Sequence, residues 1–338
     1  MGAIALSPTN IVNNKLTYDK DNTYISFPKY EESPEIMIEK GDVVFVKTGS
    51  TVGKVAYVDE LICKTTLNPQ VVVLKDIQCD GYFLSVIMST HKFQNNIRRI
   101  TVGGAVPTLS QVAMGNIVIS APTLKEQEKL SKLIYLLDER ISTQNKIIED
   151  LKKLKSAIYQ KLFSNLQGKE KPLSDLAEII KGQQINGSEL RESGKYYVMN
   201  GGIVPSGYYD SYNTEADTIS ISEGGNSCGY VQYNSSRFWS GGHCYTLRIK
   251  PTVLILTQFL FHFLKWKERD IMTLRIGSGL PNIQKKDLSK VCIVVPTLDK
   301  QQQLITLLST FQMKIENEEM YASNLDMQKQ YLLSQMFI

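Results

Sequence analysis

The sequence lacks the features that mark membrane, secreted or metal-binding proteins. It has no run of about 18 apolar residues, which a membrane-spanning helix requires, and Met1 to Pro8 is too short and uncharged for a signal peptide. Its few cysteines are odd in number and never spaced as C-x-x-C, which argues against a disulfide framework and a zinc site: Cys63, Cys79, Cys228, Cys244 and Cys292. We therefore expect a cytoplasmic protein with reduced cysteines and no membrane partner.

The sequence also lacks a large excess of charge of one sign. It has 38 Lys and Arg against 34 Asp and Glu in 338 residues, a net charge of +4. A protein that wraps a polyanion unaided usually carries a larger positive charge, because phosphate neutralisation supplies most of the non-specific affinity. Composition therefore neither requires nor excludes a nucleic-acid partner, and the length suits two domains of about 150 residues.

Groups for catalysis are scarce as well. Of the three histidines, only His243 has a neighbouring nucleophile, Cys244, and adjacent residues of a strand point to opposite faces. The segment from Gly49 to Lys54 has three residues between its glycines, whereas a phosphate-binding loop has four, and Val55 stands where that loop needs a hydroxyl. We predict a structural hairpin there, no catalytic residue, no metal site and no cofactor bound by this chain.

What the sequence does have is an internal repeat. Pro122-Thr123-Leu124 recurs 174 residues later as Pro296-Thr297-Leu298, and the same offset pairs Gly103 with Gly277 and Gln127 with Gln301 without a gap. The period is far too long for a solenoid, so we interpret it as the duplication of a whole domain and its tail.

The first part of each half has the short alternating segments typical of β-strands. We expect strands at residues 43–46, 54–58, 70–74, 117–120, 218–222, 230–233, 245–249 and 291–295, and helices at 83–96, 173–181 and 256–269.

The tail of each half has a heptad pattern. In the first tail the apolar seam is Leu130, Ile134, Leu137, Ile141, Gln144, Ile148, Leu151, Lys155, Ile158 and Leu162, and adding 174 gives the seam of the second tail. Each tail predicts a helix of about 40 residues, or ~60 Å at 1.5 Å per residue.

A helix of that length needs a partner, and we expect each tail to pair with the other as an antiparallel coiled coil. The predicted fold is α+β, a dumbbell with a pseudo-twofold repeat and one β-rich domain at each end. The expected segments are a first domain at 1–123, a first helix at 124–166, a linker at 167–172, a second domain at 173–298 and a second helix at 299–338.

Two equivalent glycine-rich loops, Gly103 to Pro107 and Gly277 to Pro281, follow arginines. Their backbone N–H groups can approach phosphates, with arginine nearby for phosphates or guanine edges, or they can be plain turns, and one loop can serve both roles. With polar residues of other turns, they define a candidate DNA-contacting set: Lys47, Thr48, Lys54, Arg98, Arg99, Thr101, Asn200, Asn226, Arg237, Arg275 and Ser278.

The order of these features resembles the specificity subunit of type I restriction-modification systems. The segment from Pro122 to Leu130 is similar to the helix-start signature of that family, whereas the second copy has Lys300 where glutamate is usual. The resemblance implies a non-catalytic subunit whose two target-recognition domains each read one half of a split DNA site, with the helices setting the spacing.

The resemblance also implies partners. These are double-stranded DNA, modification subunits that methylate adenine with S-adenosylmethionine, and restriction or translocase subunits that use ATP and Mg²⁺. Helix positions expected to dock the modification subunits are Gln127, Leu130, Ile141, Ile148, Gln301, Leu304, Ile315 and Leu325.

One departure is that the first half has no counterpart of residues 173–181, so we expect its domain to be truncated at the N-terminus. The alternative to DNA recognition is a coiled-coil scaffold that presents two β domains to other proteins.

Overall fold

The computed structural model describes residues 2–18, 22–277, 279 and 281–336, which form two compact units. Unit 1 contains residues 1–145 and 320–338, and unit 2 contains residues 146–319. Two long helices, α5 (Leu124–Ser164) and α10 (Leu298–Met336), therefore contribute to both units.

Unit 1 is built on two three-stranded sheets, in the orders β4-β1-β7 and β6-β5-β8. Its elements before α5 are β1 (Ala3–Leu6), η1 (Pro8–Asn10), β2 (Ile11–Val12), β3 (Lys15–Leu16), β4 (Thr23–Ile25), α1 (Phe27–Glu31), η2 (Pro34–Ile36), β5 (Val43–Val46), β6 (Val55–Tyr57), β7 (Thr65–Leu67), β8 (Val71–Leu74), α2 (Gly81–Ser89), α3 (His91–Ile100) and α4 (Gln111–Gly115).

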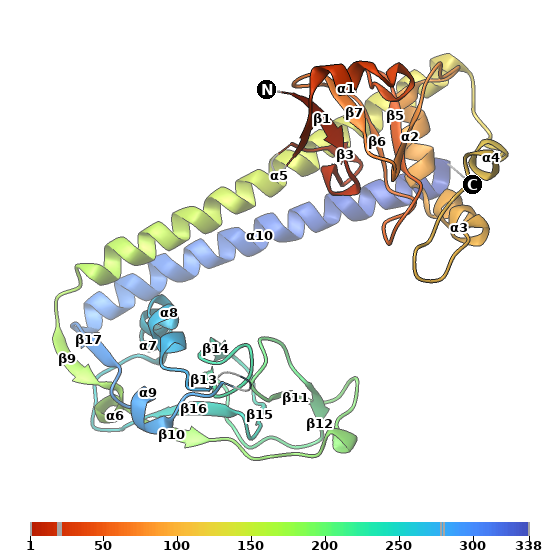
Figure 1. Ribbon diagram of the computed structural model, residues 1–338. Coiled ribbons are helices and arrows are strands. Elements are labelled where there is room, and N and C mark those ends of the chain that lie inside the picture. Colours follow the sequence, from red (N-terminus) through yellow and green to blue (C-terminus); the bar gives the residue numbers. More distant parts are fainter. Residues whose placement is uncertain (1, 19–21, 278, 280, 337–338) are drawn as a thin grey trace. The chain divides into compact units, whose positions relative to one another are not determined.

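Strand β5 is the centre of unit 1 and is buried on both faces. Val43 and Phe45 pack toward helices α2 and α3, while Val44 and Val46 pack toward the sheet that contains β1. This alternation follows from the two-residue period of a strand. Figure 1 shows α2 beside β5 and β6, so unit 1 is layered as sheet, sheet and helix.

Unit 2 has a four-stranded sheet in the order β10-β16-β13-β14, a three-stranded sheet β12-β11-β15, and the pair β17-β9. Its elements between α5 and α10 are β9 (Lys169–Pro172), α6 (Leu173–Leu176), β10 (Ala177–Lys181), η3 (Gly187–Glu189), β11 (Tyr196–Met199), β12 (Gly207–Tyr209), β13 (Thr218–Ser222), β14 (Val231–Asn234), β15 (Trp239–Ser240), β16 (Cys244–Ile249), α7 (Thr257–Trp266), α8 (Glu268–Thr273), α9 (Lys285–Leu288) and β17 (Cys292–Val295).

The core of unit 2 joins its sheet to three helices. Ile219 and Ile221 of β13 pack with Phe259 and Phe263 of α7, and Phe163 near the end of α5 packs edge-to-face on the same helix, with its ring centroid 5.5 Å from that of Phe263. Aromatic rings therefore fix the end of α5 against α7.

Several sequence predictions need correction. Residues 169–172 of the predicted linker form β9, which pairs antiparallel with β17. The helix predicted at 173–181 ends at Leu176, and its β-branched remainder pairs with β16 as β10. Residues 117–120 are not a strand, because no described segment pairs with them.

The predicted helix at 83–96 is broken at Thr90. That residue is extended, with ψ of 150°, and its hydroxyl caps the start of α3 by accepting from the N–H of Phe93. A threonine that accepts such a bond favours a new helix start over a continuous helix.

The seam positions of α5 and α10 are buried or half-buried throughout the part of the chain that the structure describes. Within unit 1, Lys329 pairs with Asp138, and Ile134 packs on Leu333. Within unit 2, Lys155 donates to Gln312 at 2.5 Å.

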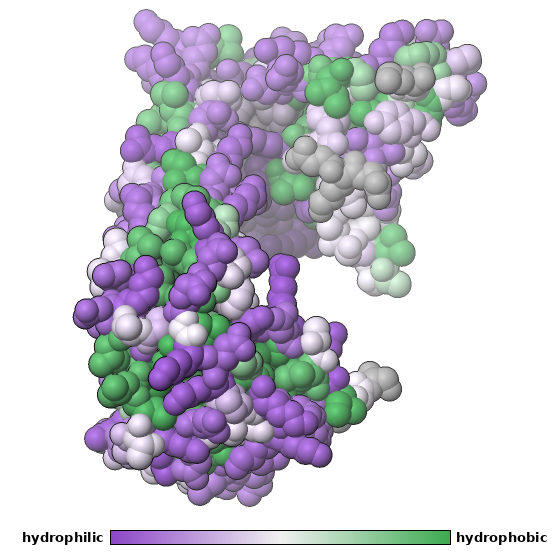
Figure 2. Space-filling model, turned by 90° about the vertical axis from the view of Figure 1, so that its left-hand side faces the viewer, coloured by the Kyte–Doolittle hydropathy of each residue, from purple (hydrophilic) through white to green (hydrophobic). Residues whose placement is uncertain are grey.

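Hydrophilic side chains cover most of the face shown in Figure 2, with hydrophobic side chains gathered in patches between them. In the described ranges, every helix is too short or too polar to cross a membrane.

Candidate functional site

In unit 1, the glycine turn after β5 is held by a second loop further along the chain. The N–H of Gly49 donates to the carbonyl of Pro107 at 2.9 Å, and the N–H of Leu109 donates to the carbonyl of Lys47 at 2.8 Å. These bonds join the predicted hairpin to the predicted glycine-rich loop. We call the two segments the unit 1 loop pair: residues 47–53 and 101–109.

Unit 2 repeats this arrangement after β13. The N–H of Gly225 donates to the carbonyl of Pro281 at 3.0 Å, and the N–H of Ile283 donates to the carbonyl of Glu223 at 2.8 Å. The described residues of these segments form the unit 2 loop pair: residues 223–229, 275–277, 279 and 281–283. The same backbone bonds therefore build both loop pairs.

The glycine-rich loops have a shared backbone requirement. Gly103 and Gly277 have φ of +99° and +102°, the left-handed region in which a Cβ is strained. The loop can turn sharply at both positions because glycine stands there, which explains why the repeat keeps a glycine at this point.

The two loop pairs differ in charge at equivalent positions. The backbone carbonyls of Lys47 and Glu223 both accept a hydrogen bond from the opposite loop, but the side chain of Lys47 is basic and that of Glu223 is acidic. Two surfaces with one backbone and different side chains can contact different partners or different sequences.

Glu223 has a buried carboxylate that joins two strands of unit 2. Its Oε1 accepts from the ammonium of Lys181 at 2.7 Å and from the hydroxyl of Tyr245 at 2.9 Å. Burial, followed by the hydrogen bond to Glu223, raises the pKa of Tyr245 above its ordinary value. The other oxygen, Oε2, is buried and has no partner among the described residues.

The structure gathers some of the candidate residues of unit 1 at its loop pair. Lys47 and Thr48 lie on the turn and are half-buried, and Lys54 follows the turn, donating to the carbonyl of Ile11 at 3.2 Å. Thr101 opens the second loop, but its hydroxyl is occupied by the carbonyl of Ile97 at 2.7 Å.

Arg98 and Arg99 precede that loop in the last turn of α3, and both are exposed. Arg98 donates to Asn95 at 3.2 Å. Two exposed guanidinium groups beside a glycine loop form a surface suited to phosphate or base contacts.

In unit 2, Asn226 lies at the tip of the turn and Arg275 opens the second loop, and both are exposed. Asn200 lies beside them in the hydrogen-bond network, since its Oδ1 accepts from the N–H of His243 at 3.1 Å, and the carbonyl of His243 accepts from the N–H of Glu223 at 2.9 Å.

Two candidates of unit 2 are not joined to the loop pair. Arg237 pairs with Glu215 at 2.8 Å and lies over the ring of Tyr212, so its charge is engaged on a different loop. Ser278 lies outside the described residues.

The helix residues expected to dock partners are buried or half-buried in the structure. Gln127, Ile148, Gln301, Leu304, Ile315 and Leu325 are buried, and Leu130 and Ile141 are half-buried. Their contact with a partner subunit stays a prediction.

Gln127 and Gln301 have an intramolecular role that the sequence did not reveal. The side chain of Gln127 accepts from the N–H of Asp80 at 2.9 Å and donates to the carbonyl of Pro122 at 2.8 Å. The side chain of Gln301 accepts from the N–H of Leu256 at 2.8 Å and donates to Pro296 at 3.0 Å. Each glutamine ties the start of a long helix to the start of a domain helix.

His243 and Cys244 are poorly suited to act as a catalytic pair. Burial raises the pKa of the Cys244 thiol to about 11, so it is a thiol and not a nucleophilic thiolate at neutral pH. Among the described residues, no group of three or more His, Cys, Asp or Glu is placed to hold a metal ion.

Sequence reasoning missed Glu223, Lys181 and Tyr245 as a group. The signal was present in the repeat, because the turn of Gly49 to Gly53 corresponds to that of Gly225 to Gly229, which places Glu223 opposite Lys47. The contacts of its carboxylate could not be found that way, because they come from two other strands, β10 and β16.

Comparison with known families adds a finding of its own. The family model described as the type I restriction modification DNA specificity domain matches residues 6–153 and 167–323. The two matches correspond to the two halves of the repeat and together cover most of the chain.

Related proteins carry the same description. A type I specificity subunit of Mycoplasma pneumoniae is 35% identical over 158 residues, which are 46% of this chain and 42% of that protein. The MjaX specificity subunit of Methanocaldococcus jannaschii is 23% identical over 332 residues, covering 87% of this chain and 76% of that protein. The chain spans about two fifths of the length of the curated Mycoplasma relatives that it matches first.

The fold is also similar to solved structures. The S subunit of the type I restriction-modification system of M. genitalium superposes with a TM-score of 0.68 at 19% identity, covering 100% of this chain and 93% of that one. A chain from a study of the assembly and conformational transition of a type I R-M system gives 0.63 at 17% identity, covering 99% of this chain and 91% of that one.

Proposed function

The chain belongs to the family of type I restriction modification DNA specificity domains, and on that premise we propose that it recognises DNA for a type I restriction-modification complex. Each unit reads one half of a split double-stranded site through its loop pair. The observation that carries this proposal is that one set of backbone bonds builds both loop pairs, while the exposed side chains differ, with Arg98 and Arg99 beside one pair and Asn226 and Arg275 on the other. A common frame with different side chains suits two readers of different sequences.

The loop pairs contact DNA through groups that position phosphates and through side chains that reach base edges. Backbone N–H groups and lysines position phosphates, while arginine and asparagine side chains at the loops contact base edges. In this proposal the exposed Arg98 and Arg99 serve unit 1, and the exposed Asn226 and Arg275 serve unit 2.

The helices α5 and α10 pair as an antiparallel coiled coil that sets the distance between the half-sites. The order of two contacts supports the antiparallel direction. Asp138 comes before Lys155 on α5, whereas the partner of Asp138, Lys329, comes after the partner of Lys155, Gln312, on α10. The heptad seam of each helix supplies the apolar contact between them.

Methylation and cleavage come from partner subunits in this proposal. S-adenosylmethionine belongs to the modification subunits, and ATP and Mg²⁺ belong to the restriction or translocase subunits, in the cytoplasm. The net charge of +4 supports a division of labour in which the modification subunits supply much of the DNA affinity. The family match favours this function over a scaffold without DNA.

Selection from a randomised duplex pool, with and without a modification subunit, tests the function. We expect weak, strongly salt-dependent binding by the chain alone, and selection of a split site by the complex. A complex that selects no sequence, or an isolated chain with the same specificity as the complex, would contradict the proposal.

Lengthening both helices tests the spacing role. One heptad is inserted after Asn145 and one after Glu319, the points at which the helices pass from one unit to the other. The seam register is kept, and each helix grows by ~10 Å, or roughly 3 base pairs of ~3.4 Å. We expect a longer gap between unchanged half-sites, with weaker binding because roughly 3 base pairs rotate one half-site by about a third of a turn. Altered half-site bases with an unchanged gap would exclude this role.

A further inference from the structure

In unit 2, the segment that follows α5 is a strand, a short helix and a second strand, and its two strands cover the edges of β17 and β16. Residues 169–172 pair with β17, and residues 177–181 pair with β16. Three apolar side chains of this segment are almost completely buried, with exposed fractions of 0% for Leu173, 1% for Leu176 and 3% for Ile179.

The corresponding edges of unit 1 have no such cover within the described residues. Strand β8, which corresponds to β16, lies at the edge of a three-stranded sheet, whereas β16 is an inner strand of four. Residues 117–120 correspond to β17 through the offset of 174, and the backbone N–H groups of Val118, Ile119 and Ser120 make no hydrogen bond to any described residue.

Equivalent side chains are less buried in unit 1. Ile293 has an exposed fraction of 0% and Leu304 of 3%, whereas their counterparts Ile119 and Leu130 are only half-buried. Pro296 is buried, but its counterpart Pro122 is exposed. The residues are apolar in both units, so the difference lies in what covers them.

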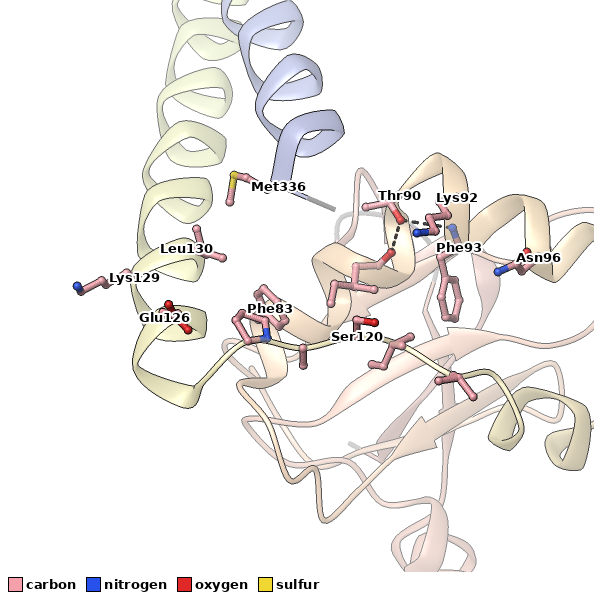
Figure 3. Close-up of a pocket in the computed structure, with 15 residues that line it drawn as sticks. Phe83, Thr90, Lys92, Phe93, Asn96, Ser120, Glu126, Lys129, Leu130 and Met336 are labelled. Carbon is pink, nitrogen blue, oxygen red and sulfur yellow. Dashed lines mark hydrogen bonds between the residues drawn. The ribbon is translucent and has the colours of Figure 1, made fainter. Parts of the chain in front are cut away.

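A cavity of about 590 Å³ lies at this edge of unit 1. Figure 3 shows Phe83 of α2, Leu130 of α5 and Met336 of α10 around the hollow, with the segment that contains Ser120 running along it. Open backbone N–H groups beside an apolar hollow are the two features that an added strand with apolar side chains requires.

We propose that this surface, formed by residues 117–122, β8 and the adjoining cavity, binds a segment of a separate polypeptide with the pattern of residues 169–181. The ligand is an extended strand ending in proline, then Leu-x-x-Leu-Ala, then a second strand with a buried Ile. Unit 2 supplies the template for this chemistry, and its own copy is held by β16 and β17, so that copy is not available to unit 1. The added strands pair with the open edges, and the leucines enter the cavity.

A synthetic peptide with the sequence of residues 165–181 tests the proposal on the full chain. We expect saturable one-to-one binding, with slower amide exchange at residues 71–74 and 117–121. A matched peptide with Leu173→Asp and Leu176→Asp should bind at least about tenfold more weakly, because two buried leucines are lost.

A pair of variants of the chain locates the site. Ala121→Pro removes an N–H from the open edge and should weaken peptide binding by about fivefold or more, while Ala121→Ser should leave it unchanged. The two peptides decide the question independently if the proline variant does not fold.

Four results would overturn the proposal. These are no binding, equal binding of the two peptides, protection confined to unit 2, or dimerisation of the chain that protects the same edge without peptide. The last result would identify a second copy as the occupant.

Discussion

The two units share a backbone but have exchanged polar and apolar side-chain pairs. In unit 1 the hydroxyl of Ser131 donates to Asp80 at 2.6 Å, and the corresponding pair in unit 2 is Ile305, in the hydrophobic core, and Leu256, which packs against that core. One to two turns further along α2 and α7, the exchange is reversed, so that unit 2 has the polar pair and unit 1 the apolar pair. There, unit 2 has a hydrogen bond of 2.6 Å between Tyr159 and His262, and unit 1 has Leu333 packed on Val86.

These exchanges show that buried side chains have changed in pairs. A buried donor left without its acceptor costs roughly 1–3 kcal/mol, so a polar residue is tolerated opposite a polar partner and an apolar one opposite an apolar partner. By contrast, Gln127 and Gln301 are the same in both units, because their partners are backbone groups that substitution cannot remove.

Among the changes predicted here, substitution of these glutamines should lower the free energy of unfolding most. Gln301 makes a third bond, to the carbonyl of Leu254 at 3.1 Å, and is completely buried. We expect Gln301→Leu to lower the free energy of unfolding by about 4 kcal/mol and Gln127→Leu by about 2–3 kcal/mol, at roughly 1–3 kcal/mol per unsatisfied group.

The chain offers a convenient way to measure the difference. Both tryptophans, Trp239 and Trp266, lie in unit 2, so fluorescence in urea follows that unit, and amide exchange follows unit 1. A loss below about 1 kcal/mol for Gln301→Leu would show that the shared glutamine does not hold the two helix starts together.

The next largest effect should come from acid, which should lower the stability of unit 2 through its buried histidine. Burial, and then the charge of Lys155, lowers the pKa of His262 to about 4 from 6.5. Because the unfolded chain binds the proton more readily, unit 2 is stable above pH 6.5 and loses stability as the pH falls toward 4. We expect about 2 kcal/mol of loss between pH 7 and pH 5.

The matched control replaces the polar pair with its unit 1 counterpart. Tyr159→Leu with His262→Val should remove most of this pH dependence, measured by urea titration of tryptophan fluorescence at both pH values. An unchanged pH dependence in the double variant would contradict the assignment to His262.

The smallest expected effect concerns a half-buried lysine on each long helix. Lys329 pairs with the carboxylate of Asp138, whereas Lys155 donates to the amide of Gln312 at the equivalent position and lies over the ring of Tyr159. Burial, and then the charge of Lys265, lowers the pKa of Lys155. Because the folded form binds this proton less readily, the stability of unit 2 rises with pH toward the ordinary value of 10.5.

Gln312→Asp should give Lys155 the partner that Lys329 has. We expect a gain of about 1 kcal/mol at pH 7, reduced by repulsion from Glu316, one turn further along the helix. Asn substitution at the same position is the uncharged control. A loss of stability with Asp but not Asn would show that unit 2 cannot accommodate the unit 1 pair.

The sequence alone predicted the elements whose pattern is local. The strands at 43–46 and 218–222 follow from β-branched runs, and both long helices follow from heptads that continue without Pro or Gly. The candidate site was predicted where the repeat aligned without a gap, because Gly103 and Gly277 mark the same turn.

The rest depends on contacts that no local pattern contains. The segment at 169–172 is a strand only because β17 lies beside it, and the equivalent residues 117–120 have a strand-like sequence but no described partner. Burial of Gln301 likewise depends on where α7 begins. Such features need the tertiary structure, since the same residues could serve exposed roles on an isolated helix.

The central claim is that the two loop pairs read separate half-sites, and selection with paired variants tests it most directly. The complex with a modification subunit selects duplexes with either Arg98→Ala and Arg99→Ala in unit 1, or Asn226→Ala and Arg275→Ala in unit 2. We predict that each pair alters only one half of the selected site, with a loss of roughly 1–3 kcal/mol of discrimination for each lost base contact. Changes in both halves from one pair, or an unchanged site from both, would contradict the account.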